Sequence, residues 1–238
     1  MQDLRQYGSR RVINMHMQDL GLSNRRMFSG VFITPYAALL SPEGTATIRA
    51  GRAHQQHSFV PPALLGELRQ TLSELSSAGR FGEGASYSSN GARDDLRSAL
   101  TCKPDIDDDR FYALYERLDE LRAWIGPQLR MPLGSGIEAT FVIYPAGGYY
   151  KRHIDSLAGE PGSGRRALSF ICYLNAPDPW DASDGGALRV EECGEEPREL
   201  LPEGGSLVLF DSKRVWHEVL PTRRERACLV GWFHHAPA

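Results

Sequence analysis

Two side chains that can bind a metal stand one residue apart in the second half of the chain. His153 and Asp155 flank one apolar residue, so in an extended backbone both point to the same face. His217 follows 62 residues after Asp155, and Arg226 follows nine residues after His217. We expect the two histidines and the carboxylate to meet once their segments fold together.

Two neutral imidazoles and one carboxylate on one side of a metal leave other coordination positions open. Such a facial triad suits non-haem Fe(II), which must also bind a co-substrate and O2. A closed structural zinc site, the main alternative, would need a fourth protein ligand. The planar fork of Arg226 can take a carboxylate in a bidentate contact, such as the far end of a 2-oxoacid that chelates the iron.

The elements that must position these residues begin with two helices. Two prolines open the first helix at Pro61, leucines recur along one side of it, and Gly79 can end it. The second helix starts after Asp107 and Asp108, carries an apolar stripe, and is expected to stop at Gly126-Pro127. Both stripes are interpreted as core.

After Gly136 the pattern changes to short β-branched and aromatic runs separated by glycine and proline turns. The predicted strands are Glu138–Tyr144, Ala167–Asn175, Ala187–Glu191, Ser206–Phe210, Trp216–Leu220 and Ala227–His234. Helices followed by regularly spaced strands predict an α+β, predominantly β fold. Its core would be a double-stranded β-helix, or jelly roll, with flanking N-terminal helices.

The composition is that of an ordinary globular protein, with 238 residues, 41% hydrophobic content and a formal net charge of −3. No overall basic field favours nucleic acid, which we do not expect as a partner. No apolar window approaches the roughly 18 residues of a membrane span, and no membrane partner is expected. Cysteines without close pairs indicate reduced thiols, so we expect a soluble cytoplasmic protein.

The first part of the chain carries a local excess of arginine. Residues 1–58 hold seven arginines against Asp3, Asp19 and Glu43. Within this segment Thr45–Arg49 is compatible with a short strand, and no other element is predicted. We therefore expect a basic N-terminal extension of unknown role over residues 1–58, followed by an oxygenase-type barrel domain with its helices over residues 59–238.

A family resemblance rests on motifs spread over the second half of the chain. They are Tyr144-Pro145, Arg152-His153-Ile154-Asp155, Tyr173-Leu174-Asn175, Trp180-Asp181, Gly185-Gly186-Ala187-Leu188-Arg189, His217-Glu218-Val219, Arg226 and Trp232-Phe233. In order and spacing they resemble the 2-oxoglutarate/Fe(II)-dependent dioxygenases of the prolyl 4-hydroxylase family. Among these, the oxygen-sensing prolyl hydroxylases and their bacterial relatives are the most similar. The resemblance covers residues 61–234.

The resemblance implies roles for individual residues. His153, Asp155 and His217 would bind Fe(II), and Arg226 would pair with the C5 carboxylate of 2-oxoglutarate. Tyr173 would hydrogen-bond the same carboxylate, and Tyr144 would line the same pocket.

Substrate contacts are implied at four further positions. Arg93 and Asp95 resemble part of a loop that closes over the peptide, Arg166 lies near another substrate-contacting arginine, and Trp232 matches an aromatic beside the prolyl substrate. No catalytic residue beyond the metal ligands is expected.

The expected reaction is hydroxylation of a prolyl residue in a protein or peptide, coupled to conversion of 2-oxoglutarate and O2 into succinate and CO2, with ascorbate as a candidate reductant. Three alternatives remain open at this level. The same chemistry could act on a free amino acid or another small molecule. The fold could serve as a non-catalytic jelly-roll binding module, or the metal could be zinc in a cupin-type enzyme.

Overall fold

The computed structural model describes residues 39–83, 87–88, 91–92, 96–104, 108–157 and 163–237. Its helices are α1 (Pro42–Arg49), α2 (Pro62–Ser77) and α3 (Tyr112–Leu129), with 3-10 turns at Asp109–Phe111, Ser163–Arg165 and Ala182–Asp184. The strands are β1 (His54–Gln56), β2 (Gly82–Glu83), β3 (Tyr87–Ser88), β4 (Gly91–Ala92), β5 (Arg97–Ser98), β6 (Leu100–Cys102), β7 (Leu133–Tyr144), β8 (Tyr149–His153), β9 (Arg166–Tyr173), β10 (Leu188–Glu191), β11 (Arg198–Leu200), β12 (Leu207–Asp211), β13 (Trp216–Val219) and β14 (Arg226–His235).

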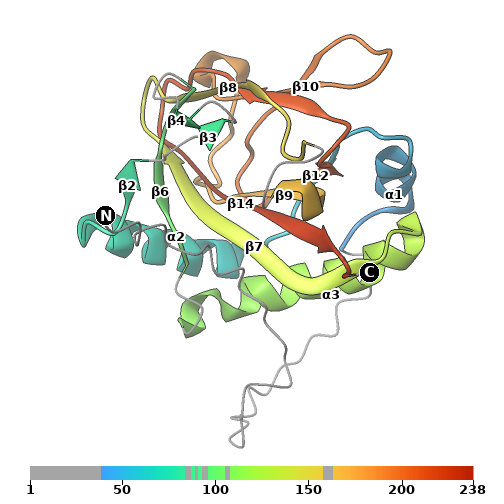
Figure 1. The fold of residues 1–238 in the computed structure, drawn as a ribbon. Helices are drawn as coiled ribbons and strands as arrows, with labels where there is room; N and C mark the ends of the chain where they lie inside the picture. Colours follow the sequence, from blue (N-terminus) through green and yellow to red (C-terminus); the bar gives the residue numbers. More distant parts are fainter. Residues whose placement is uncertain are drawn as a thin grey trace, which may run out of the picture.

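Two antiparallel sheets form the body of the fold. The larger sheet has the order β1-β12-β9-β14-β7-β6-β2, and the smaller has the order β11-β10-β13-β8-β5. In Figure 1, α2 and α3 run along the larger sheet, while β8 and β10 lie on the opposite side of the molecule. This arrangement confirms the predicted jelly-roll-like, mainly β fold.

The alternation of side chains along the strands of the larger sheet builds two separate cores. On β7, Phe141 belongs to the cluster shared with the helices, whereas the next residue, Val142, belongs to the cluster between the sheets. On β12, Leu209 and Phe210 divide in the same way. Because successive side chains point to opposite faces of a strand, apolar residues at both positions indicate a sheet covered on both sides.

Both predicted helices are present, with one difference at an end. Gly79 has a left-handed φ of 68° just beyond the end of α2, as a helix-ending glycine should. The predicted stop of the second helix at Gly126-Pro127 is wrong, because α3 continues through Pro127 to Leu129 and ends at the left-handed Arg130. The buried residues Ile125 and Gly126 keep this last turn packed, which outweighs the local preference of the Gly-Pro pair.

The described part of the N-terminal segment packs on the barrel. The short strand that Thr45–Arg49 suggested is wrong: these residues lie in α1, where the Ser41 hydroxyl accepts a hydrogen bond from the Gly44 amide and Pro42 occupies the first turn. Strand β1 extends the larger sheet by pairing with β12. The division of the chain at residue 58 stays a prediction.

A buried carboxylate attaches this N-terminal segment to the smaller sheet. Glu192, whose side chain is 2% exposed, accepts a hydrogen bond from the Ala53 amide at 2.6 Å and pairs with Arg198 at 2.9 Å. Arg198 also donates to the Ala53 carbonyl oxygen. The contacts thus join positions that are 139 residues apart in the chain.

Replacing Glu192 by alanine is expected to lower the free energy of unfolding by about 1–3 kcal/mol, because the buried Ala53 amide would lose its acceptor. Denaturant titration would measure the loss. The matched control is Glu199→Ala, which breaks a more exposed ion pair with Arg189 and should cost at most about 1 kcal/mol. Equal effects of the two substitutions would contradict a role of Glu192 in attaching the N-terminal segment.

None of the helices within the described ranges is both long enough and apolar enough to cross a membrane.

Candidate metal centre

The two histidines and the aspartate singled out in the sequence converge in the structure. The Nε2 atom of His153 lies 3.7 Å from Asp155 Oδ1, and the Nε2 atom of His217 lies 3.7 Å from Asp155 Oδ2. One candidate ligand atom from each residue falls within 4.8 Å of the other two. Atoms that bind one first-row metal at about 2 Å must lie this close together, so the arrangement fits a single ion.

Strand pairing brings the two histidines together. His153 ends β8 and His217 is its direct partner on β13. Each ring is oriented by a backbone carbonyl, because His153 Nδ1 lies 2.8 Å from the Lys151 oxygen and His217 Nδ1 lies 3.2 Å from the Val215 oxygen. A proton on each Nδ1 leaves Nε2 with a free lone pair directed at the aspartate, which is the tautomer a metal requires.

Asp155 lies two residues beyond the end of β8, so strand pairing does not hold its side chain. The Ser169 hydroxyl donates to Asp155 Oδ2 at 2.7 Å and shares a second hydrogen bond with the Ser212 hydroxyl at 2.8 Å. The carboxylate is therefore positioned from the larger sheet, while the histidines come from the smaller one.

Burial and charge set the protonation states of the cluster. Burial, followed by repulsion from His217, lowers the pKa of His153 well below its ordinary value. Burial raises the pKa of Asp155, but His217, His153 and the Ser169 hydroxyl outweigh it, so this pKa lies below its ordinary value. A neutral imidazole and an ionised carboxylate at neutral pH are the forms that bind metals.

Within the described ranges, no fourth histidine, cysteine or carboxylate joins the cluster. A closed structural zinc site would need that fourth ligand. Three ligands that leave positions open match the demand of non-haem Fe(II) instead.

A buried arginine lies in the same barrel. Arg226, at the start of β14, is 0% exposed, and its Nε donates to the Gly186 carbonyl oxygen at 3.0 Å. Its Nη2 donates to the Tyr173 hydroxyl at 3.3 Å, and its Nη1 lies 3.4 Å from the Cys228 sulfur. The guanidinium carbon lies 4.9 Å from the centre of the Tyr144 ring.

None of the carboxylates in the described residues pairs with Arg226. The neighbouring hydroxyls of Tyr173 and Tyr144 stay protonated and cannot neutralise the arginine, because burial raises the pKa of Tyr173 to about 12 and also raises the pKa of Tyr144. An uncompensated buried cation is costly, and a ligand carboxylate would compensate it. The residues around Arg226 therefore fit the acidic end of 2-oxoglutarate.

Replacing Tyr173 by phenylalanine is expected to destabilise the ligand-free protein by about 1–3 kcal/mol, because Arg226 Nη2 would lose a buried acceptor. Denaturant titration of the ligand-free protein would measure this loss. Tyr112→Phe is the control, since Tyr112 is 42% exposed and its hydroxyl should matter by less than about 0.5 kcal/mol. A Tyr173 variant as stable as the wild type would contradict the hydrogen bond to Arg226.

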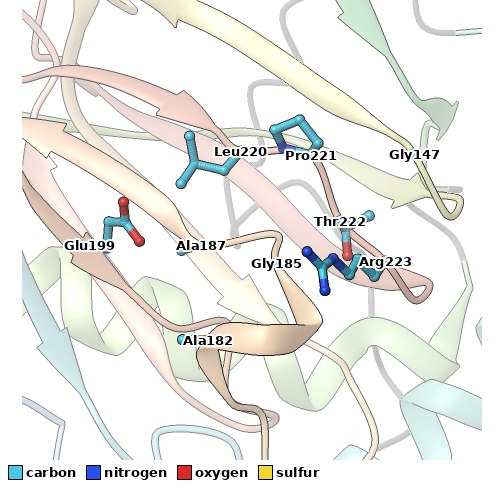
Figure 2. A pocket seen from close by; sticks show the side chains of 9 residues that line it. All are labelled: Gly147, Ala182, Gly185, Ala187, Glu199, Leu220, Pro221, Thr222 and Arg223. Atoms are coloured by element: carbon cyan, nitrogen blue, oxygen red, sulfur yellow. The ribbon is translucent and has the colours of Figure 1, made fainter.

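The loops behind Arg226 border a surface hollow of about 620 Å³. Figure 2 shows its lining residues, which are Gly147, Ala182, Gly185, Ala187, Glu199, Leu220, Pro221, Thr222 and Arg223. Gly186 packs tightly against the side chains of Thr222 and Arg226. A Cβ added at this position would lie 2.8 Å from Thr222 Oγ1 and 3.3 Å from Arg226 Cδ. The hollow contains no member of the metal cluster, so we treat it as separate from the candidate metal site.

The remaining predicted site residues fall into two groups. Arg166 lies at the start of β9 with its guanidinium carbon 3.5 Å from the centre of the Trp232 ring on β14. Their predicted substrate contacts stay predictions. Arg93 and Asp95 lie outside the described residues.

The sequence did not identify the two serines that hold the Asp155 side chain. Ser169 is a polar residue within the apolar run of β9, and Ser212 follows the apolar run of β12, which was the only signal that the sequence offered.

Part of the chain is similar to known proteins. Residues 139–234 match the family described as the 2OG-Fe(II) oxygenase superfamily. A PKHD-type hydroxylase of Synechococcus sp. strain CC9605 is 35% identical over 88 residues, which are 37% of this chain and 37% of that protein. A PKHD-type hydroxylase of Maricaulis maris is 39% identical over 92 residues, covering 37% of this chain and 38% of that protein. The chain thus matches little more than a third of the length of these relatives.

Solved structures resemble a larger part of the chain. A Pseudomonas putida prolyl-4-hydroxylase superposes with a TM-score of 0.71 at 29% identity, over 85% of this chain and 100% of that chain. A Trichoplax adhaerens prolyl hydroxylase, in complex with a peptide fragment of the hypoxia inducible factor oxygen degradation domain, shares the fold with a TM-score of 0.69 at 22% identity, over 81% and 90% of the two chains. Over residues 139–234 the chain thus matches the 2OG-Fe(II) oxygenase superfamily, and it has the fold that these prolyl 4-hydroxylase structures share.

Proposed function

We propose that this protein is an Fe(II)/2-oxoglutarate-dependent dioxygenase that hydroxylates a prolyl residue in a protein substrate and releases succinate and CO2. One observation carries the proposal: an open His-Asp-His cluster shares a barrel with a buried arginine that no described carboxylate neutralises. The cluster suits an iron with free positions, and the arginine suits the far carboxylate of a 2-oxoacid.

The proposed roles follow from the donor groups. His153, Asp155 and His217 would hold Fe(II), and Arg226 with Tyr173 would bind the C5 carboxylate of 2-oxoglutarate. Tyr144 would line the same pocket. With 2-oxoglutarate and O2, the bound iron would supply the oxidising chemistry, and ascorbate would serve only as an external reductant.

The chain's own contribution is positioning and exclusion of water. Backbone carbonyls direct both Nε2 atoms toward the aspartate, as required for ligands that must not rotate between turnovers. Aromatic rings line the histidines, with Tyr150 stacked 3.8 Å from His153 and Phe210 lying 4.8 Å from His217, measured between ring centroids. Arg226 is itself fully buried, and a carboxylate binds an arginine more strongly in such surroundings than in water.

The prolyl substrate is more specific than the dioxygenase chemistry and needs its own support. It is supported by the prolyl-4-hydroxylase of Pseudomonas putida, at 29% identity, and by the PKHD-type hydroxylases. Arg166 and Trp232, together with Arg93 and Asp95, are the proposed contacts on the substrate side. The alternative is the same chemistry on a free amino acid or another small molecule.

The test is anaerobic reconstitution with Fe(II), followed by a 2-oxoglutarate turnover assay with a panel of proline-containing peptides. We expect iron-dependent succinate formation together with a mass gain of one oxygen atom on a peptide proline. A parallel assay with free amino acids tests the alternative, and oxygen gain only there would refute the protein substrate. Turnover with zinc but not with iron would refute the oxygenase proposal, and the absence of any turnover would favour a binding module.

A further inference from the structure

The guanidinium of Arg166 connects the carboxylate of Glu138 to the backbone of Asp155. Its Nη2 donates to Glu138 Oε1 at 2.6 Å, and its Nε donates to Glu138 Oε2 at 3.3 Å. Its Nη1 donates to the backbone carbonyl oxygen of Asp155 at 3.2 Å. The flat face of the same group lies against the Trp232 ring.

Glu138 is itself fixed from two strands. It lies on β7, and its Oε2 also contacts His234 Nε2 of β14 at 3.1 Å. Burial raises the pKa of Glu138, but His234 and Arg166 outweigh it and lower this pKa to about 2, so the carboxylate is ionised. The carboxylate thus forms a stable anchor at the end of the larger sheet that faces Asp155.

The Asp155 carbonyl lies past the end of β8 and outside the pairing with β13. Two hydrogen bonds hold its peptide group: the Ser156 amide donates to the Ser212 carbonyl oxygen at 3.0 Å, and Arg166 donates to the Asp155 oxygen at 3.2 Å. We propose that Glu138, acting through Arg166, is a positioning residue that fixes the Asp155 carbonyl and so holds the aspartate in the orientation that binds the metal. The Ser169 hydroxyl fixes the side chain of Asp155, and Arg166 fixes the carbonyl end of a peptide group whose amide end is bound to Ser212. This inference rests on the metal site of the proposed function.

The hydrogen bonds of Arg166 use its whole guanidinium group. A guanidinium has five N–H donors in a rigid plane, and here donors of all three nitrogens are used by Glu138 and Asp155. Its positive charge already faces an ionised carboxylate at salt-bridge distance. A substrate carboxylate would have to displace Glu138 to form an ion pair with Arg166, so the proposed substrate contact of Arg166 would be other than an ion pair.

The test measures Fe(II) binding to the metal-free protein under anaerobic conditions, by competition with a chromogenic chelator and without any turnover. Glu138→Gln keeps the size of the side chain but removes its charge and one acceptor. Since removal of a group that supports a metal ligand typically weakens binding by about 10–100-fold, we expect the Fe(II) Kd to rise at least about 10-fold. Glu199→Gln, which alters an ion pair on the smaller sheet, should leave the Kd unchanged.

Arg166→Lys distinguishes positioning from simple neutralisation of Glu138. Lysine keeps the positive charge but lacks the planar fork that reaches two acceptors, so we expect a rise in Kd similar to that of Glu138→Gln. The double variant should lose little more than either single variant, because both substitutions break one connection. Thermal unfolding of the metal-free variants would show that each is folded.

Two results would overturn the inference: wild-type Fe(II) affinity in a folded Glu138→Gln variant, or wild-type affinity in Arg166→Lys. A wild-type protein that binds no Fe(II) would instead refute the metal site itself. Tight binding by the wild type together with unchanged variants would refute only the positioning role.

Discussion

Replacing Asp155 by asparagine is expected to abolish iron-dependent succinate formation. The carboxylate lies 3.7 Å from the Nε2 atoms of both histidines, and it is the only anionic group of the cluster. Asparagine keeps the size of the side chain but cannot supply the negative charge that Fe(II) binding requires. Because the loss of supporting residues alone costs about 10–100-fold, loss of the ligand itself should exceed 100-fold.

Succinate release and bound iron per protein would be measured together, under the same anaerobic reconstitution. Asp184→Asn is a matched control, because Asp184 is an aspartate that pairs with Arg224 at 3.2 Å outside the cluster. The control should bind and turn over like the wild type. Normal turnover by the Asp155 variant would contradict the metal assignment.

Replacing Arg226 by lysine is expected to raise the KM for 2-oxoglutarate by roughly 30-fold or more. Truncating one partner of a buried, hydrogen-bonded charge pair costs about 2–5 kcal/mol, which corresponds to at least about 30-fold in affinity. Lysine retains the charge, but it loses the planar group that bonds to Gly186 and Tyr173 and that would grip a carboxylate with two parallel hydrogen bonds.

Steady-state turnover over a wide range of 2-oxoglutarate concentrations would separate KM from kcat. We expect the larger effect on KM, because the C5 carboxylate would be bound away from the reacting atoms. Arg223→Lys is the control, since this exposed arginine lies three positions earlier, whereas the guanidinium of Arg226 is bound to Gly186, Cys228 and Tyr173. An unchanged KM in the Arg226 variant would refute the proposed carboxylate contact.

Local patterns were sufficient for most of the fold. The leucine stripe of α2 and the paired apolar positions of β9, β12 and β14 depend on spacing within one element, which a sequence displays directly. Local patterns were misleading where packing determines the structure. The composition of Thr45–Arg49 is typical of a strand, but Ser41 and Pro42 begin a helix there, and the buried side chain of Ile48 packs that helix on the core. The Gly-Pro pair in α3 is a similar case.

The sequence by itself determined which side chains could form the site, because residue type fixes ligand chemistry and because His153, Asp155, His217 and Arg226 occur in a distinctive order. Only the tertiary structure decided how they are held. Ser169 reaches Asp155 across 14 residues, Glu138 reaches Arg166 across 28, and Gly186 reaches Arg226 across 40. Such contacts depend on how distant segments pack together. In the same way, only the folded structure shows that none of the described carboxylates pairs with Arg226.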